Sequence, residues 1–436
     1  MNEGPLVAFA HLLADANVRA VLLGSLLLGA GAGAIGTFAL LRRQALLGDA
    51  LAHATLPGVC LAFLATGSKH PLVLLVGASI TGWLGTRSVR AITQHTRIRE
   101  DAALALVLSV FFGAGIVLLT HIQRTGAAAQ AGLDKFLFGQ AASLVQSDVW
   151  VLTGVTLALL ATVVIAFKEL QLLSFDEGFA RSIGWPVGVL EGLLATLITL
   201  TVTVGLQLVG VVLMVALLLT PGVAARFWTD RLPIMLVLAA LFGAIAGVMG
   251  ASVSLLAPRM PTGPWTVVAI TSIFAFSLLA APRRGVLARA WRRRRLRKRT
   301  TEENALASLW RFGETVTDWT APQSAARLAA ERGLSADVAL RTLGALKRQG
   351  WVERATGDWR LTGPGRSRAE HIVRLHRLWE LYLSERLNLP ADHVHEEAET
   401  MEHLLTPELA AALEATLARP ERDPHGRTIP TPEGAR

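Results

Sequence analysis

The sequence predicts an all-α protein that combines a polytopic membrane half of about eight or nine helices with a soluble, mostly helical tail. Of its 436 residues 52% are hydrophobic, and up to residue 281 they come in runs of about 20 residues, the length that crosses a bilayer. Residues 282–299 then carry 10 basic side chains and no acidic one. Beyond residue 300 apolar residues become periodic and charges frequent, as in amphipathic helices.

Nine segments of the first 281 residues are apolar and long enough to be membrane spans. They are 18–41, 45–66, 71–90, 102–122, 149–167, 186–206, 207–226, 231–256 and 264–281. The stretch 134–147 is apolar but shorter and contains glutamine, so we expect it to lie at the interface or to re-enter the membrane. Glycine and alanine are frequent in the first and eighth segments, which is typical of helices that pack closely in lipid.

Basic side chains predict the orientation of the chain, because cytoplasmic loops near membrane spans carry an excess of Lys and Arg. With nine spans, 10 of the 15 basic residues before residue 282 fall on the same side as the basic run 282–299. We therefore expect a multi-pass protein of the inner (plasma) membrane, with a cytoplasmic C-terminal tail and an external N-terminus. A crossing within 123–147 would reverse the side of the N-terminus. The basic run fits anionic lipid, with a nucleic-acid patch as the alternative.

Two ionisable residues, Asp49 and His53, stand inside the second apolar segment. A charge at membrane depth is costly, and it is usually retained because it pairs, relays protons or binds an ion. At a spacing of four residues the carboxylate and the imidazole share one helix face, so both can bind one cation. A buried hydrogen bond would also explain the pair, but a second acid and histidine cluster at 395–403 favours a metal. Pro57 and Gly58 predict a kink one turn later.

Four segments of the membrane half follow one another in a characteristic order. They are LLRRQALLGDALAHATLPGVCLAF, EDAALALVLSVFFGAGIVLL, KELQLLSFDEGFARSIGWPV and LQLVGVVLMVALLLTPGVAAR. Together they resemble the permease subunits of zinc, manganese and iron ABC importers (ABC-3 type), over nearly all of residues 10–281. The resemblance implies a homodimer, or a dimer with a related permease, served by a separate ABC ATPase and an extracytoplasmic metal-binding protein. The sequence contains no G-x-x-x-x-G-K-[ST] phosphate loop, so we expect no nucleotide site and no enzymatic activity in this chain.

The same resemblance implies roles for individual residues. Asp49 and His53 match the acid and the histidine of the metal pathway. The polar segment 168–186 matches the loop that contacts the ATPase. Its coupling residues would be Ser174, Phe175, Asp176, Glu177, Gly178 and Gly184. Glu191 and His121 are weaker pathway candidates, for which a packing or interfacial role is favoured.

Residues 302–362 have the pattern of a winged helix-turn-helix domain. An amphipathic helix over ENALASLWRFGE precedes a helix, a turn at Gly333, a second helix over 335–349 and a two-stranded wing. Such a second helix commonly enters the DNA major groove. Here it begins near Asp337, and residues 300–436 hold 17 basic and 21 acidic side chains, a balance poorly suited to a polyanion. A protein-interaction or sensing role is therefore at least as well supported as DNA binding.

The rest of the tail repeats the combination of histidine and carboxylate at helical spacing. The residues are His376 and Glu380, then His395, Glu399, Glu402 and His403. Mixed nitrogen and oxygen ligands without thiolate suit manganese, iron or zinc. The single cysteine, Cys60, excludes a cysteine-rich zinc site.

From residue 302 onward the tail resembles the diphtheria toxin repressor family of metal-dependent regulators. HRLWELYLSERLNLPADHVHEEAETMEH and RDPHGRTIPTPEG carry this resemblance. It implies one metal site formed by His376, Glu380 and His395. It assigns Glu399, Glu402 and His403 to the other site or to shared ligands. Glu399 resembles the manganese branch, and helices around 370–415 would form a dimer interface. Thr301 and Asn304 stand where the family's first helix supplies further ligands.

These observations divide the chain into a permease domain at 1–281, a basic linker at 282–300, a winged-helix domain at 301–364 and a metal-binding and dimerisation domain at 365–436. The predicted function is ATP-driven import of a divalent metal, manganese first and zinc or iron as alternatives, with a metal-sensing tail. Two other classes stay open. They are a membrane-tethered metal-dependent transcription regulator and an ATP-independent secondary transporter.

Overall fold

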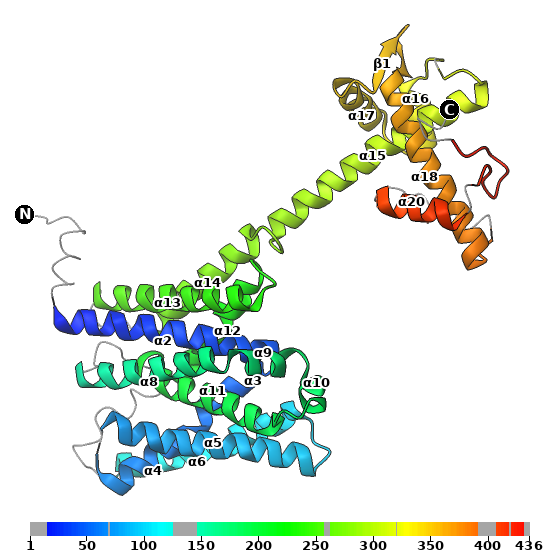
Figure 1. Ribbon diagram of the computed structural model, residues 1–436. Helices are drawn as coiled ribbons and strands as arrows, with labels where there is room; N and C mark the ends of the chain where they lie inside the picture. The colour runs from blue at the N-terminus through cyan, green and yellow to red at the C-terminus, as the bar shows by residue number, and fades with distance from the viewer. Residues whose placement is uncertain are drawn as a thin grey trace, which may run out of the picture. The chain divides into compact units, whose positions relative to one another are not determined.

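The computed structural model describes residues 15–68, 70–124, 146–256, 262–319, 321–390, 407–417 and 420–430. The chain divides into two compact units, Met1–Arg289 and Ala290–Arg436. Apart from one pair of short strands, the regular structure within the described ranges is helical (Figure 1). The expected all-α class is confirmed.

The first unit is a bundle of helices. They are α2 (Ala16–Leu41), α3 (Ala45–Ala54), α4 (Leu56–Thr66), α5 (Pro71–His95), α6 (Glu100–Arg124), α8 (Gln146–Ile165), α9 (Phe167–Phe175), α10 (Glu177–Ser182), α11 (Val187–Val209), α12 (Val211–Arg226), α13 (Leu232–Leu256) and α14 (Thr262–Ala280). Within the described ranges seven spans are long and apolar enough to cross a membrane, and α8 with α9, bent by 69°, makes a possible eighth. This fits the expected eight or nine, although the segment at 207–226 is the shorter helix α12. Residues 134–145 lie outside the described residues.

The second apolar segment of the sequence is two helices rather than one. α3 ends at Ala54 and α4 begins at Leu56, with Thr55 between them. Pro57 lies in the first turn of α4, where a missing N–H leaves no helical hydrogen bond unmade. The same ring cannot continue α3, because it lacks the donor and crowds the preceding turn. The break therefore lies one half-turn after His53, two residues before the proline that predicts a kink here.

Small residues bring α2 and α13 into backbone contact, and the two helices run side by side (Figure 1). A Cβ atom on Gly29 would lie 2.1 Å from the carbonyl oxygen of Gly243, and a Cβ on Gly243 would lie 2.1 Å from that of Gly29. Gly33 approaches the backbone of Ala239 in the same way. In lipid, where apolar burial does not drive helix association, such close approach supplies the packing energy.

The second unit contains the winged helix that the sequence predicts. Its elements are α15 (Val286–Val316), α16 (Ala325–Arg332), α17 (Ala336–Arg348), β1 (Val352–Ala355), β2 (Asp358–Leu361), α18 (Gly363–Leu387) and α20 (Pro407–Thr416). Gly333 ends α16 in the left-handed conformation, and the Ser335 side chain caps α17. The wing is an antiparallel pair in which Val352 lies opposite Leu361. The core of the winged-helix domain contains Leu306, Trp310, Leu343 and Leu346.

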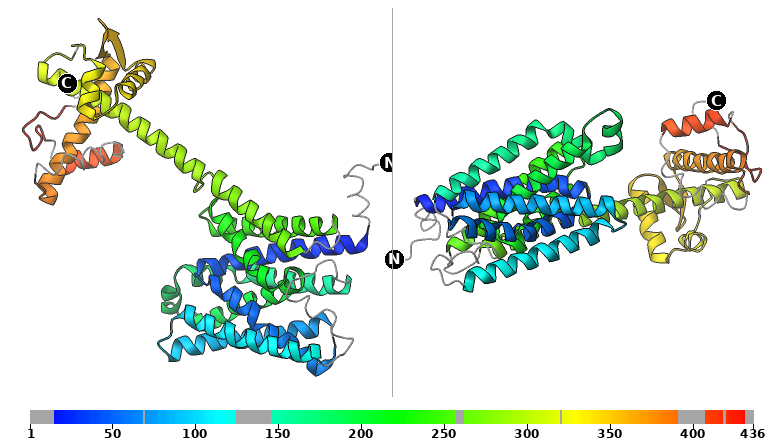
Figure 2. Two further views of the ribbon diagram at one scale, coloured as in Figure 1. Left: turned by 180° about the vertical axis from the view of Figure 1, so that it is seen from behind. Right: turned by 90° about the horizontal axis from the view of Figure 1, so that it is seen from below.

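The basic run differs from the separate linker that the sequence predicts. Residues 286–316 form one uninterrupted helix, α15, which carries the basic residues and also the first helix of the tail (Figures 1 and 2). Its basic half is exposed, whereas its second half is buried from Ala305 to Trp310 in the winged-helix core. Helix-favouring Arg, Leu and Ala throughout the run explain why no break separates the two halves.

Candidate functional site

Asp49 and His53 lie one turn apart on α3, as their spacing predicts. The Nε2 atom of His53 is 3.6 Å from the Oδ1 atom of Asp49. The side chain of His53 is 18% exposed and that of Asp49 is 41% exposed. An imidazole nitrogen and a carboxylate oxygen, both common ligands of divalent transition metals, therefore meet on one helix.

Phe112 of α6 fixes the orientation of the His53 ring. The two ring centroids are 4.7 Å apart, and the planes meet at 76° in an edge-to-face contact. The Nδ1 atom of His53 is buried and makes no hydrogen bond to any described residue. Phe112 gives no signal in the sequence, because one apolar residue in a membrane span looks like any other.

At Asp49 and His53 the described part of the chain supplies only part of a metal coordination shell. No group of three or more His, Cys, Asp or Glu side chains suited to a metal ion occurs among the described residues. A zinc ion typically takes about four ligands, and octahedral sites take about six. The Asp49 carboxylate is 41% exposed on a membrane-spanning helix, and facing lipid would be costly. It must therefore face water or another protein.

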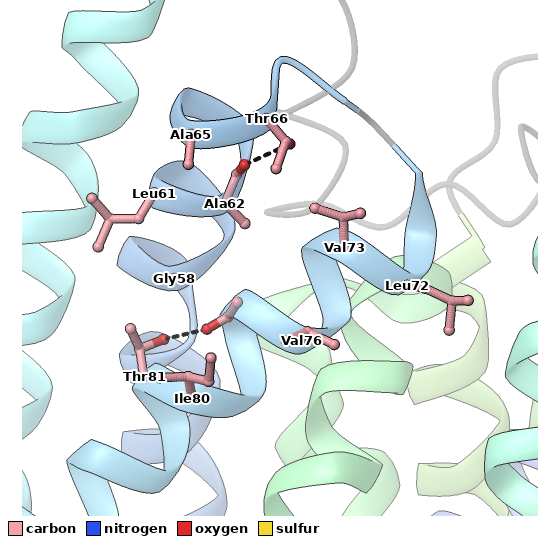
Figure 3. A pocket seen from close by; sticks show the side chains of 11 residues that line it. Gly58, Leu61, Ala62, Ala65, Thr66, Leu72, Val73, Val76, Ile80 and Thr81 are labelled. Atoms are coloured by element: carbon pink, nitrogen blue, oxygen red, sulfur yellow. Dashed lines mark hydrogen bonds between the residues drawn. The ribbon is translucent and has the colours of Figure 1, made fainter.

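One open hollow in the membrane half offers no metal ligand. It is an open groove of about 550 Å³ between α4 and α5 (Figure 3). Apolar side chains such as Leu61, Val76 and Ile80 line it, and its only polar side chains are the hydroxyls of Thr66 and Thr81. A cation would not leave water for such a surface.

The expected coupling residues lie on α9, on α10, at Asp176 between the two helices and in the turn after α10. Asp176 caps α10, and its Oδ1 atom accepts a hydrogen bond from the backbone N–H of Phe179 at 2.8 Å. Gly184 ends the segment with φ of 87°, a conformation that favours glycine. Large apolar side chains stay exposed around these helices. They are Phe175, Phe179, Ile183 and Trp185. Exposed apolar clusters of this kind mark surfaces that contact a protein or a membrane.

The two weaker candidates differ in their surroundings. Glu191 on α11 accepts hydrogen bonds from Arg42 at 2.7 Å and from Arg90 at 3.0 Å. The glutamate therefore joins three helices, which is a packing role. His121 is exposed in the last turn of α6.

In the tail, His376 and Glu380 are buried together on α18, with His376 Nε2 3.0 Å from Glu380 Oε1. The other four predicted ligands lie outside the described residues. They are His395, Glu399, Glu402 and His403. Two acids beside the expected first-helix positions are already engaged. Glu303 accepts from Arg299 and Arg368, and Glu302 accepts from Gln349.

Comparison with known proteins identifies the membrane half. Residues 14–281 match the model of the ABC 3 transport family. The chain belongs to this family. It is 44% identical to the manganese transport system membrane protein MntC of Bacillus subtilis over 374 residues, 86% of this chain and 85% of MntC. It is 46% identical to the zinc transport system membrane protein TroC of Treponema pallidum over 289 residues, 66% of this chain and 97% of TroC.

Structural and domain comparisons agree with this membership. The structure of PsaBC from Streptococcus pneumoniae in complex with Fab matches with a TM-score of 0.57 and 32% identity, covering 63% of this chain and 97% of that chain. Residues 362–431 match the metal binding and dimerisation domain of the iron dependent repressors. The chain is therefore a multi-pass ABC permease that carries a repressor-like domain at its C-terminal end.

Proposed function

We propose that this protein is the permease subunit of an ATP-driven importer of a divalent transition metal, with manganese as the first candidate and zinc or iron as alternatives. The Asp49–His53 pair carries the proposal, because it places two metal-ligand side chains on a membrane-spanning helix of an ABC permease. The extensive similarity to a protein named for manganese transport supports manganese.

Asp49 and His53 act as transient ligands. A transport site must bind its ion and also release it, so an incomplete coordination shell from one chain suits the task better than a closed cage. A dimer of permeases doubles the pair to four ligands, about the number that a zinc site uses. Such a dimer would also cover the exposed Asp49 carboxylate.

The α9–α10 segment receives the driving force from a separate ABC ATPase. Its exposed apolar residues, Phe175 and Phe179 among them, provide a surface for that partner. The metal would arrive from an extracytoplasmic binding protein at the opposite end of the bundle. With the ATPase on the cytoplasmic side, the C-terminal ends of α2 and α14 lie there as well, which supports a cytoplasmic tail in the plasma membrane.

The tail acts as a metal sensor that reports to the permease. His376 and Glu380 present imidazole nitrogen and carboxylate oxygen, a donor set that fits manganese, iron or zinc. They are buried and pre-positioned by α18, so a bound ion would be held by two oriented ligands of this helix and by further predicted ligands from 395–403. The bound ion would supply positive charge that holds these acidic residues together.

Metal uptake by reconstituted transporter tests the proposal. The full chain is assembled with its ATPase and binding protein in proteoliposomes, and Mn²⁺ uptake is measured with and without ATP. We expect ATP-dependent uptake that falls to the level of empty vesicles in Asp49→Asn and in His53→Gln. Both changes keep side-chain size while they remove the charge or the metal-binding ring.

His95→Gln is the matched control. This histidine ends a membrane helix, is exposed, and bonds only to the backbone carbonyl of Ala91 in the described contacts. Uptake in the control should equal that of the unmodified chain. Uptake without ATP would support a secondary transporter instead, and full uptake in both pathway variants would exclude the Asp49–His53 route.

A further inference from the structure

Arg42 connects the segment that faces the ATPase to the helix that bears the metal ligands. We propose that Arg42 is a positioning residue that transmits movement of α9–α10 to Asp49 and His53. This inference rests on the proposed function and names a residue through which ATP hydrolysis acts on the metal pathway.

The first observation is the position of Arg42 in the chain. It caps the C-terminal end of α2, and Arg43 follows with φ of 59°, which reverses the chain into α3. α3 starts at Ala45 and carries Asp49 in its second turn. The turn from Arg42 to Gln44 is thus the direct covalent lead into the metal-bearing helix. A shift of Arg42 moves the start of that helix with it.

The second observation is the set of contacts that Arg42 makes. Its Nη1 atom donates to the backbone carbonyl of Leu173 on α9 at 3.1 Å, and its Nη2 atom lies 3.3 Å from Glu177 on α10. The same Nη2 atom donates to Glu191 on α11 at 2.7 Å. The side chain is only 11% exposed. A planar guanidinium with several partners has little freedom to move alone.

These contacts select Arg42 over its neighbours as the link. Leu173 directly precedes the coupling residues and Glu177 is one of them, so Arg42 binds the segment on both sides of the turn at Asp176. Glu191 in turn accepts from Arg90 on α5, which ties the link into the bundle. Arg43 is exposed and forms no ion pair among the described residues. Two adjacent arginines therefore have opposite surroundings.

The ratio of Mn²⁺ transported to ATP hydrolysed tests this role. Proteoliposomes contain the full chain, its ATPase and its binding protein. In Arg42→Gln we expect the ratio to fall about fivefold or more, the lower range of allosteric coupling, while ATP hydrolysis continues. Arg42→Lys keeps the charge but loses the planar guanidinium with its several N–H donors, so it should give an intermediate ratio. Arg43→Gln removes the same charge one residue away and should leave the ratio unchanged.

A purely structural role would lower the amount of assembled complex without changing this ratio. An unchanged ratio in Arg42→Gln would therefore overturn the inference. If Arg42→Gln does not assemble, Arg42→Lys decides: a ratio equal to that of the unmodified complex overturns the inference, and a reduced ratio supports it. An unmodified complex that hydrolyses ATP without Mn²⁺ uptake would contradict the proposed function itself.

Discussion

At the scale of single residues, Arg377 is a large charged side chain that the tail buries almost completely, with 2% of it exposed. Its guanidinium donates to both carboxylate oxygens of Glu314, at 2.9 and 2.6 Å, and it lies over the Trp310 ring at 5.3 Å. It also contacts the closing loop, through the carbonyl of Thr428 and the carboxylate of Asp423. One side chain thus joins α15, α18 and the loop at 420–430. Removing it leaves acidic partners without their counter-ion.

Arg377→Met should destabilise the tail by about 3–5 kcal/mol, the usual cost of breaking a buried ion pair. Methionine keeps the length and the apolar packing, so the loss reports the charge. Limited proteolysis of the full chain in detergent would measure this loss of stability. We expect faster cleavage within the tail, residues 290–436, in the variant. Arg386→Met is the control, because Arg386 is exposed and donates only to the Thr416 carbonyl in the described contacts. Equal cleavage of both variants would contradict a stabilising role for the buried pair.

Residues with a proposed function differ in how well the sequence predicts them. Asp49 and His53 stand out because a charge inside an apolar segment is conspicuous and four residues make one helical turn. Arg42 sits among other basic residues at a span end, and its partner Glu177 is 135 positions away. Nothing local predicts such a pair. The metal-binding role of four tail residues stays a prediction, because they lie outside the described residues. They are His395, Glu399, Glu402 and His403.

At the scale of elements, α4 and α5 pack through two glycines. A Cβ atom on Gly58 would lie 2.1 Å from the Gly77 carbonyl oxygen and 2.3 Å from the Thr81 hydroxyl. Thr81 donates back to backbone carbonyls of its own helix (Figure 3). Because the nearest obstacle is backbone, a rotamer change cannot relieve the contact. The break at Thr55 directly precedes this crossing, so α4 is held in place close to Asp49 and His53.

Gly58→Ala should force α4 away from α5 and lower both the yield of folded protein and the Mn²⁺ uptake per molecule, with an overpacking cost of about 1–3 kcal/mol. Size-exclusion recovery and uptake in proteoliposomes measure the two effects. Gly113→Ala on α6 is the matched control, since a Cβ there would meet nothing within 4 Å. If the two alanine variants behaved alike, the close approach of α4 and α5 would not matter for folding or transport.

Element boundaries follow from the sequence where the chain carries a clear stop. Gly333 and Ser335 end one helix and start the next as their chemistry predicts. Pro57 likewise predicts the break between α3 and α4. The length of α15 does not follow in this way. A change from basic to amphipathic composition suggests a boundary near residue 300. The helix continues through it, because backbone hydrogen bonding does not depend on side-chain charge.

At the scale of the whole molecule, the permease and the tail are two compact units that share helix α15. Asp337 at the start of α17 forms an ion pair with Arg341, which offsets a positive charge that could otherwise contact a phosphate backbone. Leu340 on the same helix is 47% exposed, which suits a protein partner better than a phosphate backbone. These features support the sensor proposal over a tethered transcription regulator.

A sensor can act on the permease only if its metal affinity differs between the resting and the transporting state. The ATPase rate of the complete complex in nanodiscs, stimulated by the metal-loaded binding protein, should therefore fall as free Mn²⁺ is raised. A tenfold fall corresponds to a differential binding free energy of about 1.4 kcal/mol. His376→Gln/Glu380→Gln should abolish the fall and leave the stimulated rate intact. His371→Gln/Glu385→Gln, which alters the same residue types at exposed positions of α18, should retain it. An equal response of both double variants would show that free Mn²⁺ acts elsewhere, most directly on the Asp49–His53 pathway.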